Sequence, residues 1–361
     1  MLKMNSPIEK LVKNPLGFLD ANDNDNDIVA ISSRVRLARN FKKFLFPAAA
    51  SVAELQKVRN SIDDLYETRK LGKNNLARFF IDDLSELDRE ILFERHLVSN
   101  ELITNPVNRA AYISANEKMS LMINEEDHLR IQTFTNGFNL KKAYKAATSI
   151  DDQISSELEY AFDPRLGYLS SCPSNVGTGL RASVMLHLVG LQLKGELESA
   201  IRALNKLNFA VRGVFGDGSS NSGALFQISN QSTLGCSEEE FLEKIQNTIE
   251  QIISYELNAR ESLFRSKQYE ILDYIGRAYG LMKHAYLLDK KELSNTISGV
   301  KLGVDMGVFS NLNIRRVHEI FISLGDAHLQ KYHGTQFKNN EERNAYRAAL
   351  VRDKIRKGAL D

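Results

Sequence analysis

The clearest fold signal lies in NRAAYISANEKMSLMINEEDHLRIQTF, residues Asn108–Phe134. Its apolar residues come in near-alternation, which is typical of strands that are half buried rather than of helices. The polar segments SANEK (114–118) and NEED (124–127) interrupt this alternation. The pattern therefore predicts three short antiparallel strands, with a turn at the first interruption and a strand end at the second.

Helical periodicity surrounds these strands on both sides. Ser51 is a suitable N-cap for a helix over 51–71, and further helical patterns cover 87–99, 140–162, 193–208 and 237–264. Two more strands, 209–215 and 223–230, flank the glycine-rich segment GDGSSNSG. The segment 28–41 begins as a strand edge and leads into a polar turn that carries arginines. Beyond about Arg260 the sequence predicts only helices and loops.

Together these elements predict a mixed domain of strands and helices to roughly residue 260, followed by an all-helical domain. We expect an N-terminal extension over 1–27, a mixed domain over 28–258 and a helical domain over 259–361. The Asp/Asn-rich segment DANDNDND (20–27) is typical of an exposed loop at the end of the extension.

Composition excludes several function classes. The chain has 361 residues, of which 43% are hydrophobic, and its net charge of +1 gives no field that would recruit nucleic acid or an anionic membrane. Two cysteines cannot form a disulfide framework or a four-thiolate zinc site. The N-terminus lacks an apolar signal segment, and no apolar run reaches the length of a membrane span. We therefore expect a soluble, cytoplasmic protein without nucleic-acid or membrane partners.

Arginines in short polar segments are the first candidates for chemistry. The sequence contains no P-loop and no dinucleotide-binding glycine pattern, and its histidines lack metal-ligand spacing. Guanidinium groups can instead hold phosphate oxygens in bidentate fashion. One such arginine is usually a solvated surface residue, but five in one domain point to a phosphate-handling site. They are Arg34, Arg36, Arg130, Arg181 and Arg212.

Acidic residues and a cysteine accompany these arginines. Glu125, Glu126 and Asp127 precede Arg130, and alternation along a strand allows at most two of them to face one site. From composition alone, the run also fits a solvated turn. Cys172 fits either a small buried hydrophobic residue or a reactive thiol, because Ser174 and a downstream arginine provide surroundings that lower a thiol pKa.

The blocks SSRVRLAR, NEEDHLRI, CPSNVGTGLR and VRG, the last followed by an acid, resemble the phosphagen (guanidino) kinases in the same order along the chain. Phosphagen kinases carry a helical domain of about a hundred residues before the first block, whereas only 31 residues precede Ser32 here, too few for such a domain. The chain instead continues past the kinase region with a helical segment. Both features resemble the bacterial protein arginine kinases of the McsB type. The resemblance implies an α+β fold, in which an antiparallel sheet flanked by helices precedes a small all-helical domain.

The resemblance implies a role for each matched residue. It implies Glu126 as the base that also holds the guanidinium, Asp217 as the second acid and Cys172 as the thiol beside the guanidino group. Asp217 stands where arginine kinases have Glu and creatine kinases have Asp. The implied nucleotide-binding residues are Ser32, Ser33, Arg34, Val35, Arg36, His96, Arg130, Arg181, Ala182, Ser183, Val184, Met185, Arg212, Gly213, Val214, Phe215 and Gly216.

The implied reaction is transfer of the γ-phosphoryl of ATP to arginine side chains of proteins. Two carboxylates orient the guanidinium and one takes its proton, while arginines and Mg²⁺ offset the charge on the phosphoryl group. In this family the metal contacts mainly phosphates and water, so no protein metal site is expected. The implied partners are proteins with exposed arginines, repressors among them, a Clp-type ATPase and protease in stress response, and a second copy of the chain in a homodimer.

A second motif lies near the C-terminus. McsB-type kinases carry R-D-x-x-R-A, which forms an allosteric phosphoarginine pocket, and the matching residues here are Arg343, Asn344, Arg347 and Ala348. The two arginines are four apart on one helix face, so both can reach one phosphate. Asn344 replaces the acid, which weakens recognition of the arginine part. A solvated basic helix is the alternative interpretation.

Two other functions remain open at this stage. One is a small-molecule arginine kinase, which a comparison of free arginine with an arginine peptide as acceptor distinguishes. The other is a non-catalytic adaptor that reads phosphoarginine for a protease. A pure reader has no use for the acids, Cys172 and five phosphate-binding arginines.

Overall fold

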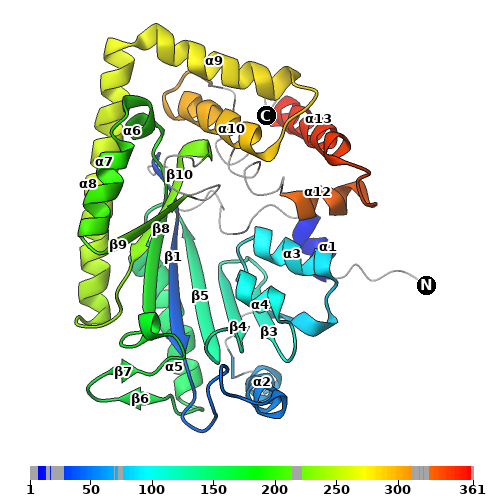
Figure 1. The fold of residues 1–361 in the computed structure, drawn as a ribbon, viewed down its shortest axis with the longest axis vertical. Coiled ribbons are helices and arrows are strands. Elements are labelled where there is room, and N and C mark those ends of the chain that lie inside the picture. The colour runs from blue at the N-terminus through cyan, green and yellow to red at the C-terminus, as the bar shows by residue number, and fades with distance from the viewer. Residues whose placement is uncertain are drawn as a thin grey trace. The chain divides into compact units, whose positions relative to one another are not determined.

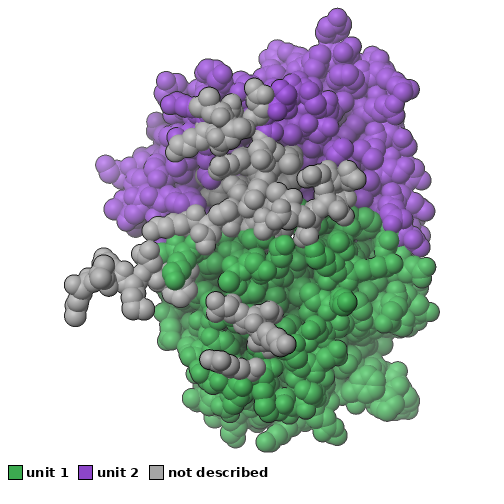
Figure 2. All heavy atoms as spheres, turned by 180° about the vertical axis from the view of Figure 1, so that it is seen from behind, with its two compact units in different colours: residues 1–18, 32–184, 229–246 green, residues 19–31, 185–228, 247–361 purple. Residues whose placement is uncertain are grey.

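A computed structural model describes residues 7–13, 17, 28–68, 70–71, 76–213, 222–310, 312, 317, 320 and 325–358. The chain divides into two compact units, which Figure 2 colours separately. The first contains residues 1–18, 32–184 and 229–246, and the second contains residues 19–31, 185–228 and 247–361. The expected domain boundaries at residues 27 and 258 stay a prediction.

The central element is an eight-stranded sheet with the order β2-β3-β4-β5-β1-β8-β10-β9 (Figure 1). Neighbouring strands from β2 to β1 pair in antiparallel fashion. The eight strands are β1 (Ala30–Arg39), β2 (Leu76–Phe80), β3 (Ala110–Ser114), β4 (Met119–Ile123), β5 (Leu129–Asn136), β8 (Leu180–His187), β9 (Phe209–Gly213) and β10 (Leu225–Asn230). The alternating stretch 108–134 forms β3, β4 and β5, so the three predicted strands and the α+β class are confirmed.

The prediction for residues 28–41 was wrong in one respect. The expected polar turn does not occur, because β1 continues through all of these polar residues to Arg39 and lies between β5 and β8. Ser33, Val35 and Leu37 are fully buried on one face of this strand. The polar residues on the other face give this central strand the sequence pattern of a solvated turn, so the pattern did not predict a strand here.

Helix α5 (Leu140–Ser155) covers one face of the sheet. Thr133 Oγ1 on β5 donates to the Ala143 carbonyl at 2.7 Å, and Thr135 Oγ1 donates to the Asn139 carbonyl at 3.0 Å. Successive residues of a strand alternate between faces. The even-numbered residues of β5, from Arg130 to Phe134, therefore point away from α5.

The other helices largely match the predicted spans. Ser51 caps α2 in a complete capping box with Glu54, as the sequence predicts. After Arg260, the described part of the chain contains helices and loops, and none of the helices there or elsewhere in the described ranges has the length and apolar character to span a membrane. The helices are α1 (Pro7–Lys13), α2 (Val52–Glu67), α3 (Glu86–Glu94), α4 (Asn100–Thr104), α6 (Val189–Lys194), α7 (Leu197–Lys206), α8 (Glu238–Ser266), α9 (Gln268–His284), α10 (Lys290–Asp305), α12 (Asp326–His333) and α13 (Asn340–Gly358).

Short elements complete the description of the chain. The strands β6 (Phe162–Asp163) and β7 (Gly167–Tyr168) form a separate two-stranded sheet. Single 3₁₀ turns are η2 (Ile81–Asp83), η3 (Pro173–Asn175) and η5 (Ser222–Ala224). The turn η3 follows Cys172 directly, with Pro173 as its first residue.

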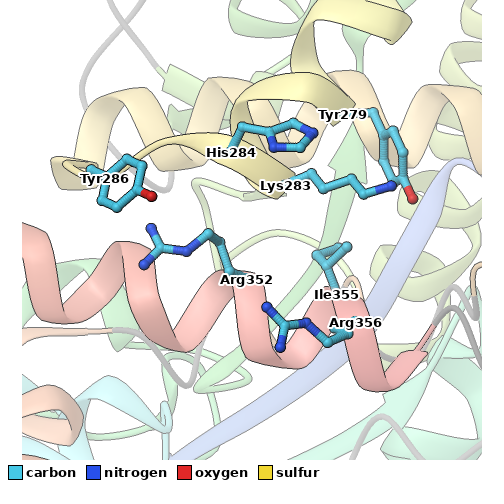
Figure 3. A pocket seen from close by; sticks show the side chains of 7 residues that line it. All are labelled: Tyr279, Lys283, His284, Tyr286, Arg352, Ile355 and Arg356. Carbon is cyan, nitrogen blue, oxygen red and sulfur yellow. The ribbon is translucent and has the colours of Figure 1, made fainter.

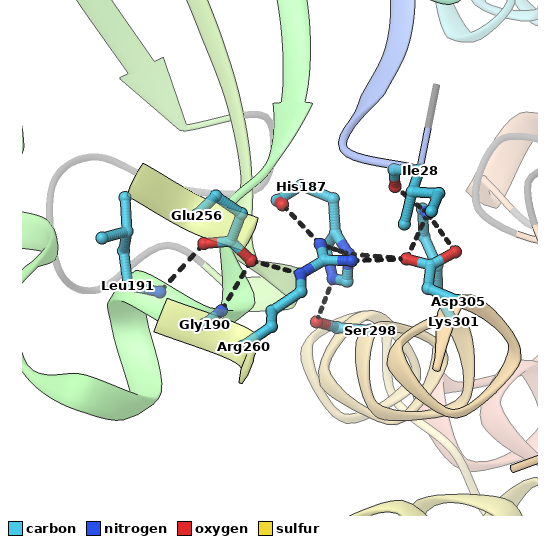
Figure 4. A network of polar contacts seen from close by, with 9 residues as sticks. All are labelled: Ile28, His187, Gly190, Leu191, Glu256, Arg260, Ser298, Lys301 and Asp305. Atoms are coloured by element: carbon cyan, nitrogen blue, oxygen red, sulfur yellow. Dashed lines mark hydrogen bonds and ion pairs between the residues drawn. The ribbon is translucent and has the colours of Figure 1, made fainter. Parts of the chain in front are cut away.

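A buried ionic network ties α6, α8 and α10 together within the second unit (Figure 4). The Glu256 carboxylate accepts from the Gly190 and Leu191 amides and from Arg260 Nε, at 2.6–2.9 Å. Arg260 also donates to Asp305 at 2.9 Å, and Lys301 donates to the same carboxylate at 2.8 Å. Burial lowers the pKa of Lys301 and raises that of Glu256. Loss of one partner is therefore expected to destabilise the unit strongly.

Candidate active site

Three of the predicted arginines share one face of the sheet in the first unit. Arg34 and Arg36 lie two residues apart on β1, and the antiparallel register pairs them with Phe134 and Gln132 of β5. Arg130 pairs with Ala38 one step further along. Because paired residues and residues two apart share a face, all three guanidinium groups project from the side opposite α5.

Arg181 joins this group at the start of β8. Its Nη2 donates to Ser229 Oγ at 3.2 Å, and its charge lowers the pKa values of both Arg34 and Arg36. We call Arg34, Arg36, Arg130 and Arg181 the arginine cluster. The fifth predicted arginine, Arg212, lies exposed on β9 in the second unit.

The arginine cluster is half-buried, and its like charges repel one another. Burial, with the charges of Arg130 and Arg181, lowers the pKa of Arg34 to about 9. The pKa of Arg36 is lowered well below its usual value, first by burial and then by Arg34, Arg130 and Arg181. The Nε atoms of Arg34 and Arg36 are buried and have no hydrogen-bond partner among the described residues. A polyanion would supply the missing acceptors and relieve the repulsion between the cations.

Glu125 offsets part of this charge. Its carboxylate is buried and forms an ion pair with Arg130 Nη1, and its charge acts on Arg36 in the opposite sense to the arginines. Of the three acids in the NEED turn, Glu125 thus faces the arginine cluster. The four guanidinium groups of the cluster carry more positive charge than the Glu125 carboxylate offsets.

The other predicted nucleotide residues divide between two environments. Val35, Ala182 and Val184 are fully buried in the core. Ser33 Oγ accepts from the Asn139 amide and donates to the Gly137 carbonyl, both at 2.9 Å. Ser32 shares the face of Arg34 by alternation, and Ser183 Oγ donates to the Arg34 carbonyl at 3.5 Å. The structure thus places Ser32 and Ser183 close to the arginine cluster and the three apolar side chains away from it.

The backbone of His96 lies next to the arginine cluster. Its carbonyl accepts from Gln132 Nε2 at 2.8 Å, and Gln132 is the cross-strand partner of Arg36. The second unit contains Met185 on β8 and Gly213 at the end of β9. Four predicted residues, Val214, Phe215, Gly216 and Asp217, lie outside the described residues.

The NEED turn separates the three acids by burial. Asn124 adopts the left-handed conformation at φ 57°, and its amide donates to the His128 carbonyl at 3.0 Å to close the turn between β4 and β5. Glu125 and Asp127 are 4% and 2% exposed, whereas Glu126 is exposed. Glu126 is therefore the acid of this run that is open to an incoming substrate.

Asp127 anchors the loop that carries Cys172. Its two carboxylate oxygens accept from Asn40 Nδ2 at 2.6 Å, Ser170 Oγ at 2.6 Å and the Ser171 amide at 2.8 Å. Asn175 Nδ2 adds a longer contact at 3.4 Å. These bonds attach Ser170–Asn175, which we call the Cys172 loop, to the turn that presents Glu126. Glu126 and Cys172 thus lie on two segments that hydrogen bonds to Asp127 hold together.

Cys172 is a free, partly exposed cysteine within this loop. Its amide donates to Ser170 Oγ at 3.1 Å, and its Sγ lies 3.1 Å from Ser174 Oγ. The sequence-based alternative of a buried hydrophobic cysteine does not fit this environment. The thiol is accessible, and the Ser174 hydroxyl is within hydrogen-bond distance of it.

Two glycines explain the composition of the segment between Cys172 and Arg181. A Cβ on Gly177 would lie 2.2 Å from the Thr233 carbonyl oxygen, and one on Gly179 would lie 2.5 Å from the Ala38 oxygen. Both glycines have positive φ, 115° and 62°. Close backbone approach and left-handed geometry therefore require glycine here, and they bring Arg181 onto the sheet beside β1.

The side chain of His128 connects the NEED turn to residues 41–45. It is fully buried, its Nδ1 accepts from the Phe41 amide at 3.1 Å, and its Nε2 lies 2.9 Å from the Leu45 carbonyl. These contacts fix a neutral ring that donates from Nε2. Burial lowers the pKa of His128.

The site therefore contains a cluster of arginines, an exposed carboxylate at Glu126 and a partly exposed thiol at Cys172. No group of three or more potential metal ligands occurs within the residues that the structure describes. The chemistry favoured by this arrangement is phosphoryl transfer, in which positioned cations stabilise charge on the transferred group.

The C-terminal motif residues lie together on α13 in the second unit. Arg347 is 1% exposed and donates to the Asp326 carboxylate at 2.5 Å, to the Leu288 carbonyl at 2.9 Å and to Asn344 Oδ1 at 2.6 Å. Arg343 Nη1 lies 3.4 Å from the same Asp326 carboxylate. Ala348 is fully buried. The sequence placed both arginines on one face but gave no signal for Asp326, which binds both of them.

Comparisons with known proteins agree with the chemistry of the site. Residues 57–259 match the family "ATP:guanido phosphotransferase, C-terminal catalytic domain", and residues 268–359 match "Protein-arginine kinase McsB C-terminal domain". The chain is 40% identical to a protein-arginine kinase of Bacillus velezensis over 92% of this chain and 91% of that protein. It is also 40% identical to one of Clostridium kluyveri, over 92% and 96% of the two chains.

Solved structures show the same fold. A lombricine kinase aligns with a TM-score of 0.54 and 25% identity over 68% of this chain and 70% of that one. A duplicated taurocyamine kinase of Schistosoma mansoni aligns with a TM-score of 0.59 and 22% identity, over 78% of this chain and 44% of that one. The fold is thus that of the phosphagen kinases, a class of guanidino phosphotransferases. The chain belongs to the ATP:guanidino phosphotransferase family, and within it to the protein-arginine kinases of the McsB type.

Proposed function

We propose that this chain transfers the γ-phosphoryl group of ATP to arginine guanidinium groups in proteins. The observation that carries the proposal is the half-buried arginine cluster, in which Arg34 and Arg36 each have a buried Nε without a partner among the described residues. A cluster of like charges that depresses its own pKa values is costly unless an anion binds it. The triphosphate of ATP supplies that anion.

The phosphates bind first in the proposed reaction. Arg34, Arg36, Arg130 and Arg181 hold their oxygens, with Arg212 as a fifth contact carried over from the family resemblance. Because the arginines are fixed by the sheet, they need no rearrangement as charge develops on the transferred group. Mg²⁺ supplies further charge neutralisation when bound, with phosphate and water oxygens as its main ligands.

The guanidinium of the substrate is the acceptor of the phosphoryl group in the proposed reaction. Glu126 orients it and accepts its proton as the nitrogen attacks the γ-phosphorus, with ADP as the leaving group. The exposure of Glu126 supports access by an arginine on a protein surface. Cys172 lies beside the guanidinium and holds its cationic ground state, and Asp217 completes the carboxylate pair, both by analogy with the family.

The cellular role is proposed from the family resemblance. Phosphorylated arginines mark damaged proteins and repressors for a Clp-type protease during stress. We further propose that the chain acts in the cytoplasm as a homodimer. The match of residues 268–359 to the McsB C-terminal domain supports this assignment over that of a small-molecule arginine kinase.

The C-terminal motif is proposed as a regulatory phosphoarginine pocket. Arg343 and Arg347 are the phosphate ligands, and both have a buried Nε without a partner among the described residues. Asn344 lacks the carboxylate that the family motif provides for the guanidinium. Asp326 already contacts both arginines and is 47% exposed, so we propose that it supplies the missing carboxylate to the ligand.

A comparison of acceptors tests the proposed function. Wild-type chain, ATP and Mg²⁺ are incubated with an arginine-containing protein or with free arginine, and ADP release is measured for both. We expect release with the protein and little above background with free arginine. Faster turnover of free arginine would instead establish a small-molecule kinase. ATP binding without turnover of either acceptor would contradict the proposal.

A further inference from the structure

A basic pocket lies in the second unit, between the end of α9, the residues that follow it and α13 (Figure 3). Its volume is about 480 Å³. It is lined by Tyr279, Lys283, His284, Tyr286, Arg352 and Arg356, and Ile355 adds a buried apolar wall. Neither the proposed transfer reaction nor the C-terminal motif uses these residues.

The lining combines positive charge with aromatic rings. Three of its residues, Lys283, Arg352 and Arg356, are cations at neutral pH, and none of the described lining residues is acidic. The Arg352 guanidinium lies 4.8 Å from the centroid of the Tyr286 ring, and Lys283 Nζ lies 5.7 Å from that of Tyr279. The cations therefore lie against ring faces at two sides of the pocket.

Arg352 is held more firmly than the other cations. Its Nη1 donates to the Ala285 carbonyl just beyond the end of α9, which joins α13 to that segment. Tyr279 packs against Phe309, with ring centroids 4.9 Å apart. One arginine and one ring of the pocket are thus fixed by the surrounding fold, whereas Lys283 and Arg356 are exposed and free to adjust to a ligand.

The pocket is separate from the regulatory motif on the same helix. Arg352 and Arg356 each follow a motif arginine, Arg343 and Arg347, by nine positions. Nine residues make about two and a half turns at roughly 3.6 residues per turn, so the two pairs project from opposite sides of α13. The motif arginines contact Asp326, and the pocket arginines face α9.

We infer that this pocket binds a nucleoside phosphate. Lys283, Arg352 and Arg356 suit two or more phosphate groups, and guanidinium groups favour phosphate oxygens. Tyr279, Tyr286 and Ile355 offer ring faces and an apolar wall for a planar base. The volume lies within the range of roughly 300–1,000 Å³ that is typical of small-molecule sites, and it exceeds what a single phosphate needs. The site does not depend on the proposed catalytic activity.

Hydrogen exchange with peptide resolution tests the inference on the full chain. ADP, inorganic tripolyphosphate and adenosine are added separately at constant ionic strength, and protection is measured over 279–286 and 352–356. We expect protection by ADP, weaker protection by tripolyphosphate and none by adenosine. Equal protection by ADP and tripolyphosphate would overturn the base-binding part, and absence of protection by ADP would overturn the site. Protection over β1 reports separately on the catalytic arginine cluster, so the two proposals fail independently.

Charge reversals assign the effect to the pocket. In Lys283→Glu/Arg356→Glu both changed residues are exposed, and we expect ADP to protect 279–286 at least tenfold more weakly. The matched control, Arg265→Glu/Arg277→Glu, makes the same change in net charge at exposed residues outside the lining. Unchanged protection in the pocket variant, or an equal loss in the control, would contradict the inference.

Discussion

Asp127 is expected to control both the stability of the first unit and the rate of phosphoryl transfer. Replacing it with the isosteric amide, Asp127→Asn, turns one of two accepting oxygens into a donor that faces other donors. Asn40, Ser170 and Ser171 all donate to this carboxylate within 2.8 Å, at a position that is 2% exposed. A hydrogen bond to a charged group contributes about 1.5–3 kcal/mol, and a buried unsatisfied donor costs about 1–3 kcal/mol.

The substitution loses the charge and at least one of these bonds, so we expect a decrease of about 2–4 kcal/mol in the free energy of unfolding. Because the same bonds position the Cys172 loop beside Glu126, the kcat for protein phosphorylation should fall by about 10- to 100-fold. Urea denaturation measures the first quantity and steady-state ADP release the second. Alkylation of Cys172, followed by mass spectrometry of its peptide, reports directly on the loop and should become faster.

A control separates local from general effects. Asp273 is exposed and pairs with Arg277 on the helix surface, so Asp273→Asn should change stability by less than about 1 kcal/mol. It should leave kcat and Cys172 alkylation unchanged. If Asp127→Asn matched this control in stability, kcat and alkylation, the anchoring role of Asp127 would be refuted.

Burial lowers the pKa of His128 below the unfolded value of about 6.5. The stability that the neutral ring contributes is therefore complete above about pH 6.5 and should be lost as pH falls towards the folded pKa. Over this pH range, the urea midpoint should drop less in His128→Gln than in wild type. Tripolyphosphate should raise the melting temperature more than sodium chloride of equal ionic strength, and Arg36→Ala should reduce this difference; equal shifts from both salts would exclude a phosphate-binding cluster. Gly179→Ala should destabilise the chain by at least about 1 kcal/mol, because its Cβ meets the Ala38 oxygen at 2.5 Å with φ at 62°; an unchanged denaturation midpoint would count against this geometry. Asp326→Ala should weaken binding of a phosphoarginine peptide at least tenfold in fluorescence anisotropy while inorganic phosphate binding changes less, and equal losses for both ligands would argue against a contact with the guanidinium.

Periodicity in the sequence was sufficient for most of the elements. Alternation over 108–134 correctly predicted β3 to β5, and the capping residues Ser51 and Glu54 marked the start of α2. Periodicity did not reveal β1, because its serines and arginines give this strand the composition of a solvated turn. The buried Nε atoms of Arg34 and Arg36, which have no partner among the described residues, are consistent with a site for an anion.

The sequence predicted the charged residues of the candidate site but not the residues that position them. Arg34, Arg36 and Arg130 could be proposed from residue type, and the structure places them on one face of the sheet. The role of Asp127 depends on donors more than forty residues away, at Ser170 and Ser171, which no local pattern reveals. The burial difference between Glu126 and its two acidic neighbours likewise arises from the turn at Asn124 rather than from composition.

We expect this chain to phosphorylate arginine in proteins with Glu126 as the base. Mass spectrometry of an arginine-rich protein incubated with the chain, ATP and Mg²⁺ tests it most directly, with Glu126→Gln as the matched variant. We predict acid-labile phosphate on arginine with wild type and at least a hundredfold less with the variant, whose fold should be unchanged because this side chain is exposed. Equal phosphoarginine from both proteins would contradict the assignment of the base, and its absence from both would contradict the kinase itself.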